Sequence, residues 1–306
     1  MMPAKQMNIA NPLLGEYFTP RLRTNADLSK TNWFRVGGLA QWLFKPEDAQ
    51  DLSVFLAALP LEIPVTVLGV GSNIIIRDGG LDGVVVKLGR GFTQLSVVGG
   101  QLSAGAACLD VNVAQFACEN SLAGLEFLSG IPGTIGGGVA MNAGAYDNDV
   151  SQVLVEAEIV QRDGKICTLS NAELKFVYRN STLPEGAIVT KAIFKTAPGN
   201  KTEIAKKIKE IQAAREDTQP IRSRTGGSTF KNPEGHKAWE LIERAGCRRL
   251  TIGGAQVSEK HCNFLINTGN ATAADLENLG EEVIKRVREK TGVTLEWEIK
   301  RIGKMK

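Results

Sequence analysis

The fold of this chain can be inferred from two segments, Val67-Leu-Gly-Val-Gly-Ser-Asn73 and Ser129-Gly-Ile-Pro-Gly-Thr-Ile-Gly-Gly-Gly-Val-Ala-Met-Asn-Ala-Gly-Ala-Tyr146. Both consist of small and apolar residues without a charged side chain. Such a backbone can approach a bulky ligand closely, and successive N–H groups can bind a phosphate. Each segment alone could also be a close-packed turn, which is the simpler interpretation of the first one. Two of them in one strand-rich region favour a dinucleotide lying between them.

Glycine is concentrated around these segments. The chain has 33 glycines among 306 residues, roughly 11% against a usual ~7%. Ten lie between Gly69 and Gly105 and seven between Gly124 and Gly144. They alternate with apolar and β-branched residues and do not recur at every third position, so neither collagen nor a low-complexity tract is indicated.

Several classes of site are excluded by what the sequence lacks. There is no G-x-G-x-x-G motif, no Walker A motif and no HExxH motif. The two histidines, His236 and His261, are too few for a multi-histidine metal centre, and we expect no metal site. The 36 basic and 33 acidic residues are interspersed, so a nucleic-acid partner is only weakly indicated.

The sequence also indicates the cellular setting. Its five cysteines form no CxxC pair, which favours a reducing compartment, and we expect a cytoplasmic protein. No uninterrupted apolar stretch is long enough to cross a membrane, and the N-terminus lacks the apolar core of a signal peptide. We expect a monomer without a membrane partner.

Residue patterns predict a strand-rich region followed by a more helical one. The boundary is Pro198-Gly199-Asn200. Expected strands cover residues 41–44, 65–68, 73–76, 84–88, 94–98, 153–160, 166–169, 187–195, 264–267 and 294–302. Expected helices run from Pro46 to Leu59 and over residues 110–120, 201–216, 238–245 and 272–290, the last with a capping box from Thr272 to Asp275.

The motifs together resemble one family. G-x-G-S-N, followed some sixty residues later by I-P-G-T-I-G-G and N-A-G-A-Y, resembles the FAD-binding module of the vanillyl-alcohol-oxidase type. With Trp33-Phe-Arg-Val-Gly-Gly38, Gly227-Ser-Thr-Phe-Lys-Asn-Pro233, Gly254-Ala-Gln-Val-Ser258 and Phe264-Leu-Ile-Asn267, the chain is similar to the UDP-N-acetylenolpyruvoylglucosamine reductase family of peptidoglycan synthesis. The likeness extends from about residue 25 to residue 302.

The resemblance implies an α+β fold in three parts. We expect an N-terminal arm at residues 1–25, a two-lobed FAD-binding domain at 26–198 and a smaller α+β substrate domain at 199–306. The last strand, about 293–302, should return towards the flavin. FAD should be held non-covalently, because neither glycine segment contains histidine or cysteine. The expected FAD-binding residues are Gly69, Gly71, Ser72, Asn73, Pro132, Gly133, Thr134, Gly136, Gly137, Asn142 and Ala143.

The resemblance also implies catalytic residues. Tyr178-Arg-Asn-Ser181 matches the family's Y-R-x-S, which makes Arg179 the catalytic arginine, and Ser228 matches the serine proton donor. Glu298 matches the C-terminal glutamate, although Glu296 lies two residues away on the same face of the expected strand. Tyr178, Arg215, Lys231 and Asn232 are the expected substrate-binding residues, and Arg222 and Arg224 are further candidates for the substrate diphosphate.

The implied activity is the NADPH-dependent reduction of a UDP-sugar enolpyruvyl ether to UDP-N-acetylmuramate. The alternatives are a small-alcohol or lactone oxidase on the same FAD fold, and a flavin-binding module without chemistry of its own. No long insertion separates Arg179 from Ser228, so the chain resembles the shorter, type II class of the family. The loop at 182–185 or the one at 223–227 could then close over the substrate.

Overall fold

The first lobe is a four-stranded sheet packed on a helix. The computed structural model of the protein describes residues 18–306. The sheet has the order β1-β2-β5-β3, in which β1 (Leu22–Asp27) is antiparallel to β2 (Leu39–Phe44). Strand β5 (Leu81–Val86) lies parallel between β2 and β3 (Val65–Val67). Helix α2 (Ala49–Ala58) buries Phe55, which stacks on Phe44 with ring centroids 3.8 Å apart.

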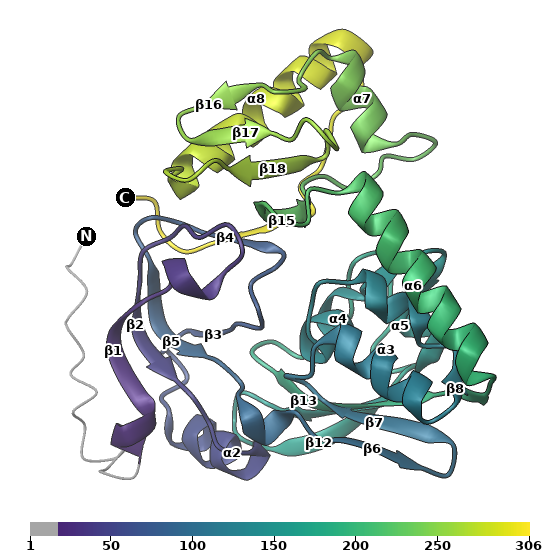
Figure 1. The fold of residues 1–306 in the computed structure, drawn as a ribbon. Helices are drawn as coiled ribbons and strands as arrows, with labels where there is room; N and C mark the ends of the chain where they lie inside the picture. The colour runs from purple at the N-terminus through teal and green to yellow at the C-terminus, as the bar shows by residue number, and fades with distance from the viewer. Residues whose placement is uncertain (1–17) are drawn as a thin grey trace.

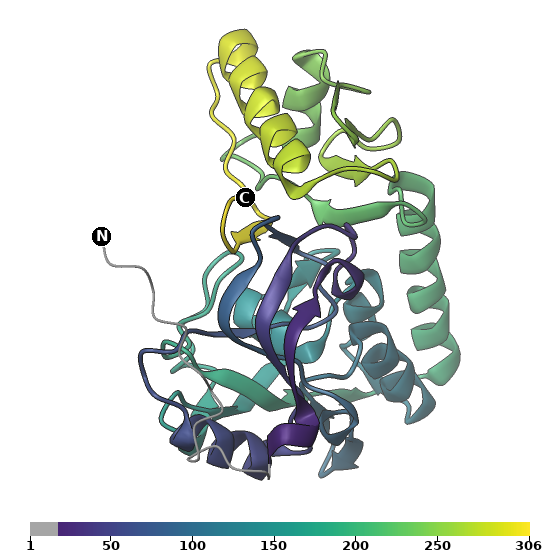
Figure 2. The same ribbon diagram turned by 90° about the vertical axis from the view of Figure 1, so that its left-hand side faces the viewer.

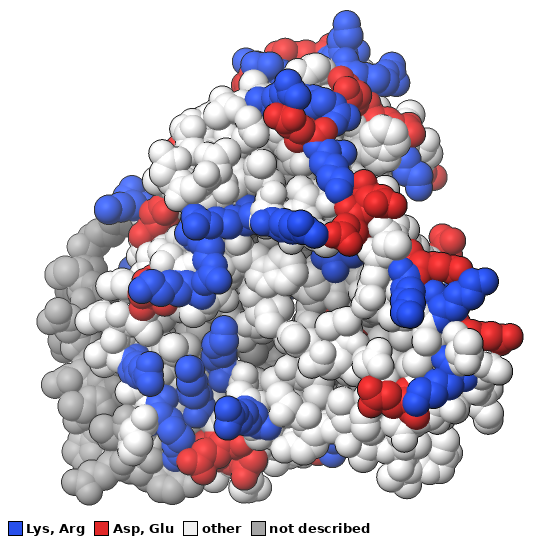
Figure 3. All heavy atoms as spheres, in the orientation of Figure 1, with Lys and Arg blue, Asp and Glu red and all other residues white. Residues whose placement is uncertain are grey.

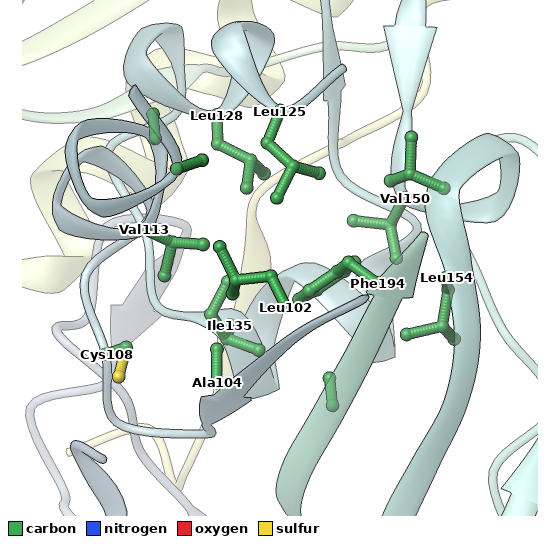
Figure 4. Packing of buried hydrophobic residues seen from close by; sticks show 14 of the residues in the cluster. Leu102, Ala104, Cys108, Val113, Leu125, Leu128, Ile135, Val150, Leu154 and Phe194 are labelled. Atoms are coloured by element: carbon green, nitrogen blue, oxygen red, sulfur yellow. The ribbon is translucent and has the colours of Figure 1, made fainter. Parts of the chain in front are cut away.

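The second lobe is an antiparallel five-stranded sheet in the order β12-β11-β13-β7-β6. Short helices cover one face, and Figure 4 shows Leu102, Phe194, Ile135 and Val113 meeting between the sheet and these helices. The strands are β6 (Leu95–Val98), β7 (Gln101–Gly105), β11 (Leu154–Val160), β12 (Ile166–Ser170) and β13 (Ile188–Lys195); the covering helices are α3 (Asp110–Glu119), η4 (Glu126–Gly130), α4 (Ile135–Met141) and α5 (Val150–Val153).

The third part lies above the two lobes in Figure 1. Helix α6 (Lys201–Thr218) runs along the outside of the second lobe and connects that lobe to the third part, as both ribbon views show (Figures 1 and 2). The third part, which lies wholly within the described residues, contains a sheet and two further helices. Its sheet has the order β15-β18-β17-β16, and α8 packs on the sheet through a shared core. The elements are β15 (Arg224–Ser228), α7 (Ala238–Arg244), β16 (Thr251–Ile252), β17 (Ala255–Val257), β18 (Phe264–Asn267) and α8 (Ala273–Thr291).

The third part is joined to the first lobe by the end of the chain. Strand β19 (Lys300–Ile302) pairs in parallel with β4 (Ile74–Ile76). Asp78, just after β4, accepts hydrogen bonds from the N–H groups of Ala273 and Ala274 at 3.0 and 3.1 Å and so caps α8. Among residues 18–306, no helix is long and apolar enough to span a bilayer.

Most of the expected elements are present within a few residues. The 110–120 helix is α3, the 153–169 hairpin is β11 and β12, and the 264–267 strand is β18. The capping box is also confirmed, because Thr272 accepts from the N–H of Asp275 at 3.0 Å and the Asp275 carboxylate accepts from the N–H of Thr272 at 2.9 Å.

Other expectations differ from the structure. The first helix begins at Ala49 rather than at Pro46, because Asp48 provides the N-cap by accepting from the N–H of Asp51. Residues 22–25, assigned to an N-terminal arm, belong to β1, while residues 1–17 lie outside the described residues. The strand expected at 294–302 is regular only from Lys300, and most of the loop expected at 223–227 is part of β15.

The second-lobe core gives a stability prediction. Phe194→Ala should lower the free energy of unfolding by about 3–5 kcal/mol, because it leaves a cavity among fully buried neighbours. The control Val98→Ala, on a side chain that is 74% exposed, should change it by less than about 0.5 kcal/mol. Equilibrium denaturation measures both, and equal effects would contradict the assignment of this core.

Candidate active site

The two glycine-rich segments lie against each other. A β-carbon on Gly69 would come within 2.7 Å of Oγ1 of Thr134, so the two segments can approach this closely only because residue 69 is glycine. Gly71 has a φ of +68°, and a β-carbon there would lie 2.6 Å from the α-carbon of Asn32. The N–H of Trp33 donates to the Gly71 carbonyl at 3.0 Å. The first segment is therefore held between the second segment and the Trp33 motif.

The second segment is fixed to the second-lobe sheet at the start of α4. The N–H groups of Ile135 and Gly136 donate to the carbonyls of Cys108 and Ala106 at 3.0 and 2.9 Å. Gly137, in the same helical turn, is exposed. The start of this helix is thus anchored on the sheet while Gly137 remains accessible to a ligand.

Asn142 ends α4 in the left-handed conformation, with a φ of 43°. Its amide group donates to the Val177 carbonyl at 3.2 Å, and its amide oxygen accepts from the N–H of Ser151 at 2.9 Å. The side chain of Asn142 therefore holds two neighbouring loops in place, and its expected contact with FAD remains a prediction.

A buried carboxyl lies beneath the second segment. Asp110 is 1% exposed, and neither carboxylate oxygen has a hydrogen-bond partner among the described residues. A β-carbon on Gly133 would lie 2.6 Å from Oδ2 of Asp110. Burial raises the pKa of Asp110 well above its ordinary value. A protonated carboxyl here would not repel a nearby diphosphate, so these residues fit FAD.

Arg179 stands at the tip of a tight turn. Val177 and Asn180 exchange backbone hydrogen bonds of 3.0 and 3.2 Å, and Ser181 Oγ donates to the Ala140 carbonyl of α4 at 3.0 Å. Arg179 itself has a φ of +58°. A left-handed conformation is costly for arginine, and such strain is concentrated at functional sites. The turn therefore holds the guanidinium in one place at the edge of α4.

Glu298 comes from the other end of the chain to meet Arg179. Arg179 Nε lies 3.0 Å from Oε1 of Glu298, and Nη2 donates to the Gly144 carbonyl at 3.1 Å. Burial raises the pKa of Glu298, and Arg179 opposes this effect. Glu296 is 75% exposed in its side chain and pairs with Lys231 at 3.4 Å instead. The geometry thus supports Glu298 over Glu296 as the site residue.

Asn73 connects the first glycine segment to Glu298. Its amide group lies 3.3 Å from both the carbonyl oxygen of Glu298 and Sδ of Met141 in α4. The N–H of Lys300 donates to the Asn73 carbonyl at 3.1 Å. Both expected FAD-binding segments and the expected catalytic glutamate therefore meet around this side chain.

Ser228 lies at the end of β15, facing the same region. A β-carbon on the preceding Gly227 would lie 3.9 Å from the carbonyl oxygen of Ser72 in the first glycine segment. The N–H of Glu298 donates to the carbonyl of the following Thr229 at 2.8 Å. Ser228 is half-buried, and its hydroxyl has no hydrogen-bond partner within residues 18–306. The hydroxyl is thus free to act on a ligand.

The expected substrate-binding residues, all within residues 18–306, are distributed over several elements, and only Tyr178 directly contacts Arg179. Tyr178 is exposed, and the Arg179 guanidinium lies 5.0 Å from its ring centroid. Asn232 accepts from the N–H of Ala238 at 2.9 Å, so part of its side chain supports α7. Arg215 Nε donates to Gln219 at 3.0 Å. Lys231 pairs with Glu296. The side chain of Arg222 is 88% exposed, and Arg224 donates a hydrogen bond to the Gly269 carbonyl.

Sequence reasoning did not single out Asp110, Ser181 or the position of Tyr146. Tyr146 Oη donates to the Ile211 carbonyl of α6 at 3.1 Å, and burial lowers the pKa of the neighbouring Arg215. The start of a helix at Asp110 was expected, but nothing in the sequence indicates that its carboxyl is unpaired. Ser181 ends the Tyr178 motif, but the motif does not indicate that its hydroxyl binds the Ala140 carbonyl.

Comparison with known proteins identifies the family. Residues 40–170 match the model of an FAD binding domain, and residues 219–302 match that of the UDP-N-acetylenolpyruvoylglucosamine reductase C-terminal domain. A UDP-N-acetylenolpyruvoylglucosamine reductase from Parvibaculum lavamentivorans is 56% identical over 92% of this chain and 91% of its own length. The chain belongs to the UDP-N-acetylenolpyruvoylglucosamine reductase family. A second member, from Gluconobacter oxydans, is 57% identical over 93% of both chains.

A solved member of this reductase family has the same fold. The UDP-N-acetylenolpyruvylglucosamine reductase of Thermus caldophilus superposes with a TM-score of 0.81 and is 35% identical, covering 92% of this chain and 100% of that one. The expected reductase family and the FAD-binding fold with a smaller C-terminal domain are therefore confirmed. The limits of the domains and the roles of individual site residues remain predictions.

The buried Asp110 gives a pH prediction for the cofactor-free protein. A carboxyl whose pKa is raised on folding binds its proton more tightly in the folded chain, so stability falls as the pH rises from the ordinary value of 3.8 towards the raised one. Asp110→Asn cannot ionise and should lose this dependence. Its melting temperature should match wild type near about pH 4 and exceed it near about pH 8.

The exposed Asp217, on α6, provides the control for this experiment. Asp217→Asn should follow the wild-type curve at every pH. Parallel curves for wild type and Asp110→Asn would show that Asp110 is ionised throughout the range and would contradict the interpretation.

Proposed function

We propose that the protein reduces UDP-N-acetyl-3-O-(1-carboxyvinyl)-glucosamine to UDP-N-acetylmuramate, with NADPH as the reductant and FAD bound non-covalently. The observation that supports this best is the 3.0 Å pair between Arg179 and Glu298, which joins distant parts of the chain beside both glycine segments. When bound, FAD supplies the chemistry by which a hydride passes from NADPH to the enolpyruvyl double bond.

Arg179 and Glu298 are proposed to bind the substrate carboxylate. Hydride addition next to this carboxylate places negative charge on it, and a fixed guanidinium stabilises that charge. In the structure Glu298 already pairs with Arg179, so an ionised Glu298 would compete with the substrate. Burial raises the pKa of Glu298, so this carboxyl takes up a proton at a higher pH than an exposed glutamate does, and its protonated form donates a hydrogen bond to the same carboxylate.

Ser228 is proposed to deliver a proton to C2 of the reduced substrate. A serine hydroxyl is a weak acid, so this role requires a basic intermediate and a fixed geometry. The unpaired hydroxyl and the short distance between Gly227 and the first glycine segment support this role. Tyr178, Arg215, Lys231 and Asn232 are proposed to bind the UDP-sugar around this centre.

The oxidase alternative is not favoured, because the substrate-domain model and the relatives belong to the reductase family. Purified protein should be yellow and should consume NADPH only when the enolpyruvyl sugar nucleotide is present. Sustained NADPH oxidation with oxygen alone would contradict the reductase function. We further propose a cytoplasmic, monomeric enzyme without a nucleic-acid partner.

Ser228→Ala tests the proton transfer. Reduction of the flavin by NADPH should proceed at the wild-type rate, because Ser228 has no part in it. The second half-reaction should slow by about 10²–10⁴-fold, the usual range for a lost proton donor. Stopped-flow absorbance of the flavin separates the two steps.

The matched control for this experiment is Ser96→Ala, at an exposed serine in β6 of the second lobe. It should leave both half-reactions unchanged. An unchanged second half-reaction in Ser228→Ala would remove Ser228 from its proposed role.

Glu298→Gln tests the protonation of the carboxyl. In wild type, the substrate affinity should fall as the pH rises through the raised pKa of Glu298, because the ionised carboxylate competes for Arg179. In Glu298→Gln the affinity should be independent of pH over that range. Substrate titrations at several pH values measure this, and Glu296→Gln should keep the pH dependence of wild type. Identical profiles for wild type and Glu298→Gln would contradict the competition.

A further inference from the structure

Lys87 occupies a position that the function described so far does not use. It is the first residue after β5, and its N–H donates to the Phe44 carbonyl at the end of β2 at 2.9 Å. The N–H of Leu68, just after β3, donates to the Val86 carbonyl at 2.9 Å. Lys87 therefore lies at the carboxyl ends of three parallel strands, beside the residue that precedes Gly69. In α/β sheets, ligands bind at this end of the strands.

The pairing pattern also indicates which way Lys87 projects. Side chains alternate along a strand, so Lys87 shares a face with Val85. Val85 shares a cluster with Leu68, which lies in the first glycine segment, and with Ile76, which follows that segment. The lysine is thus on the face of the first lobe that carries this segment.

Lys87 is a cation without an acidic partner. It is half-buried, and no carboxylate in residues 18–306 lies within ion-pair distance of it. Burial and the neighbouring Lys45 both lower its pKa. The comparably buried Lys191 and Lys231 differ in this respect, because each has a glutamate at 3.0 and 3.4 Å respectively. Removing an ammonium group from water without a counter-charge is costly, and an anionic ligand would offset that cost.

The surface around Lys87 is basic as well. Figure 3 shows Lys and Arg side chains gathered over the part of the first lobe above α2. Lys45 directly follows β2, and Arg90 is the next basic residue after Lys87 at the end of β5. Both side chains are exposed. A positive field at this place would attract a phosphate-bearing ligand.

We propose that Lys87 binds the diphosphate of FAD as its charged partner, with Lys45 as an exposed second cation. This inference rests on the proposed function, in which FAD is the cofactor. The glycine segments offer backbone N–H groups, which bind a phosphate without carrying a full charge. Lys87 supplies the full charge next to the first segment, and this explains why a half-buried lysine has no acidic partner within the protein.

FAD affinity of the cofactor-free protein tests the proposal without relying on turnover. The dissociation constant is measured by quenching of flavin fluorescence for wild type, Lys87→Met, Lys87→Gln and Lys87→Arg. Loss of a charge-assisted hydrogen bond should weaken FAD binding by about ten- to a hundredfold in the Met and Gln variants. Lys87→Arg, which keeps the charge, should stay within about threefold of wild type.

The matched control is Lys165→Met, which removes the same charge from an exposed turn in the second lobe. It should leave FAD affinity unchanged. Wild-type affinity in both Lys87→Met and Lys87→Gln overturns the inference, and so does an equal loss in Lys165→Met. If the Lys87 variants keep FAD affinity but are reduced more slowly by NADPH, the phosphate recognised is that of NADPH, and the assignment to FAD is overturned. Failure of wild type to bind FAD would instead contradict the proposed function.

Discussion

The parallel pairing of β19 with β4 is the contact on which the candidate site depends. It brings the last residues of the chain to the first lobe and aligns Lys300 with Ile74. The backbone of Glu298 thereby reaches Asn73, and its carboxyl reaches Arg179 from the second lobe. Without this strand pair, Glu298 would not be placed beside Asn73 and Arg179.

The absence of a side chain has a different structural role in each of the two glycine segments. At Gly69 the absent side chain allows contact with Thr134, while at Gly133 it makes room for the carboxyl of Asp110. Arg179 provides the contrast, because a residue with a long side chain accepts a positive φ. Its turn is held by Ser181 and by the side chain of Asn142, and these bonds offset the unfavourable conformation.

Local patterns made much of the fold predictable, whereas long-range contacts did not. The capping box at Thr272 and the apolar face of α3 are encoded within a few residues, so α3 and α8 could be inferred. Helix α4 was missed because glycine disfavours helices, and its first N–H groups are bound instead by the carbonyls of Ala106 and Cys108. The family resemblance supplied Arg179 and Glu298, but their pairing and the isolation of Asp110 and Lys87 follow only from the tertiary structure.

The return of the chain end to β4 has a consequence for how the protein is made. The two glycine segments and the turn around Arg179 leave the ribosome long before residues 300–302, which complete the strand pair with β4. Domains generally fold from the N-terminus during synthesis. The two lobes can therefore form on the nascent chain, but the position of Glu298 is set only once residues 300–302 have left the ribosome. A chain that ended before Lys300 would lack the strand that places Glu298 beside Asn73 and Arg179.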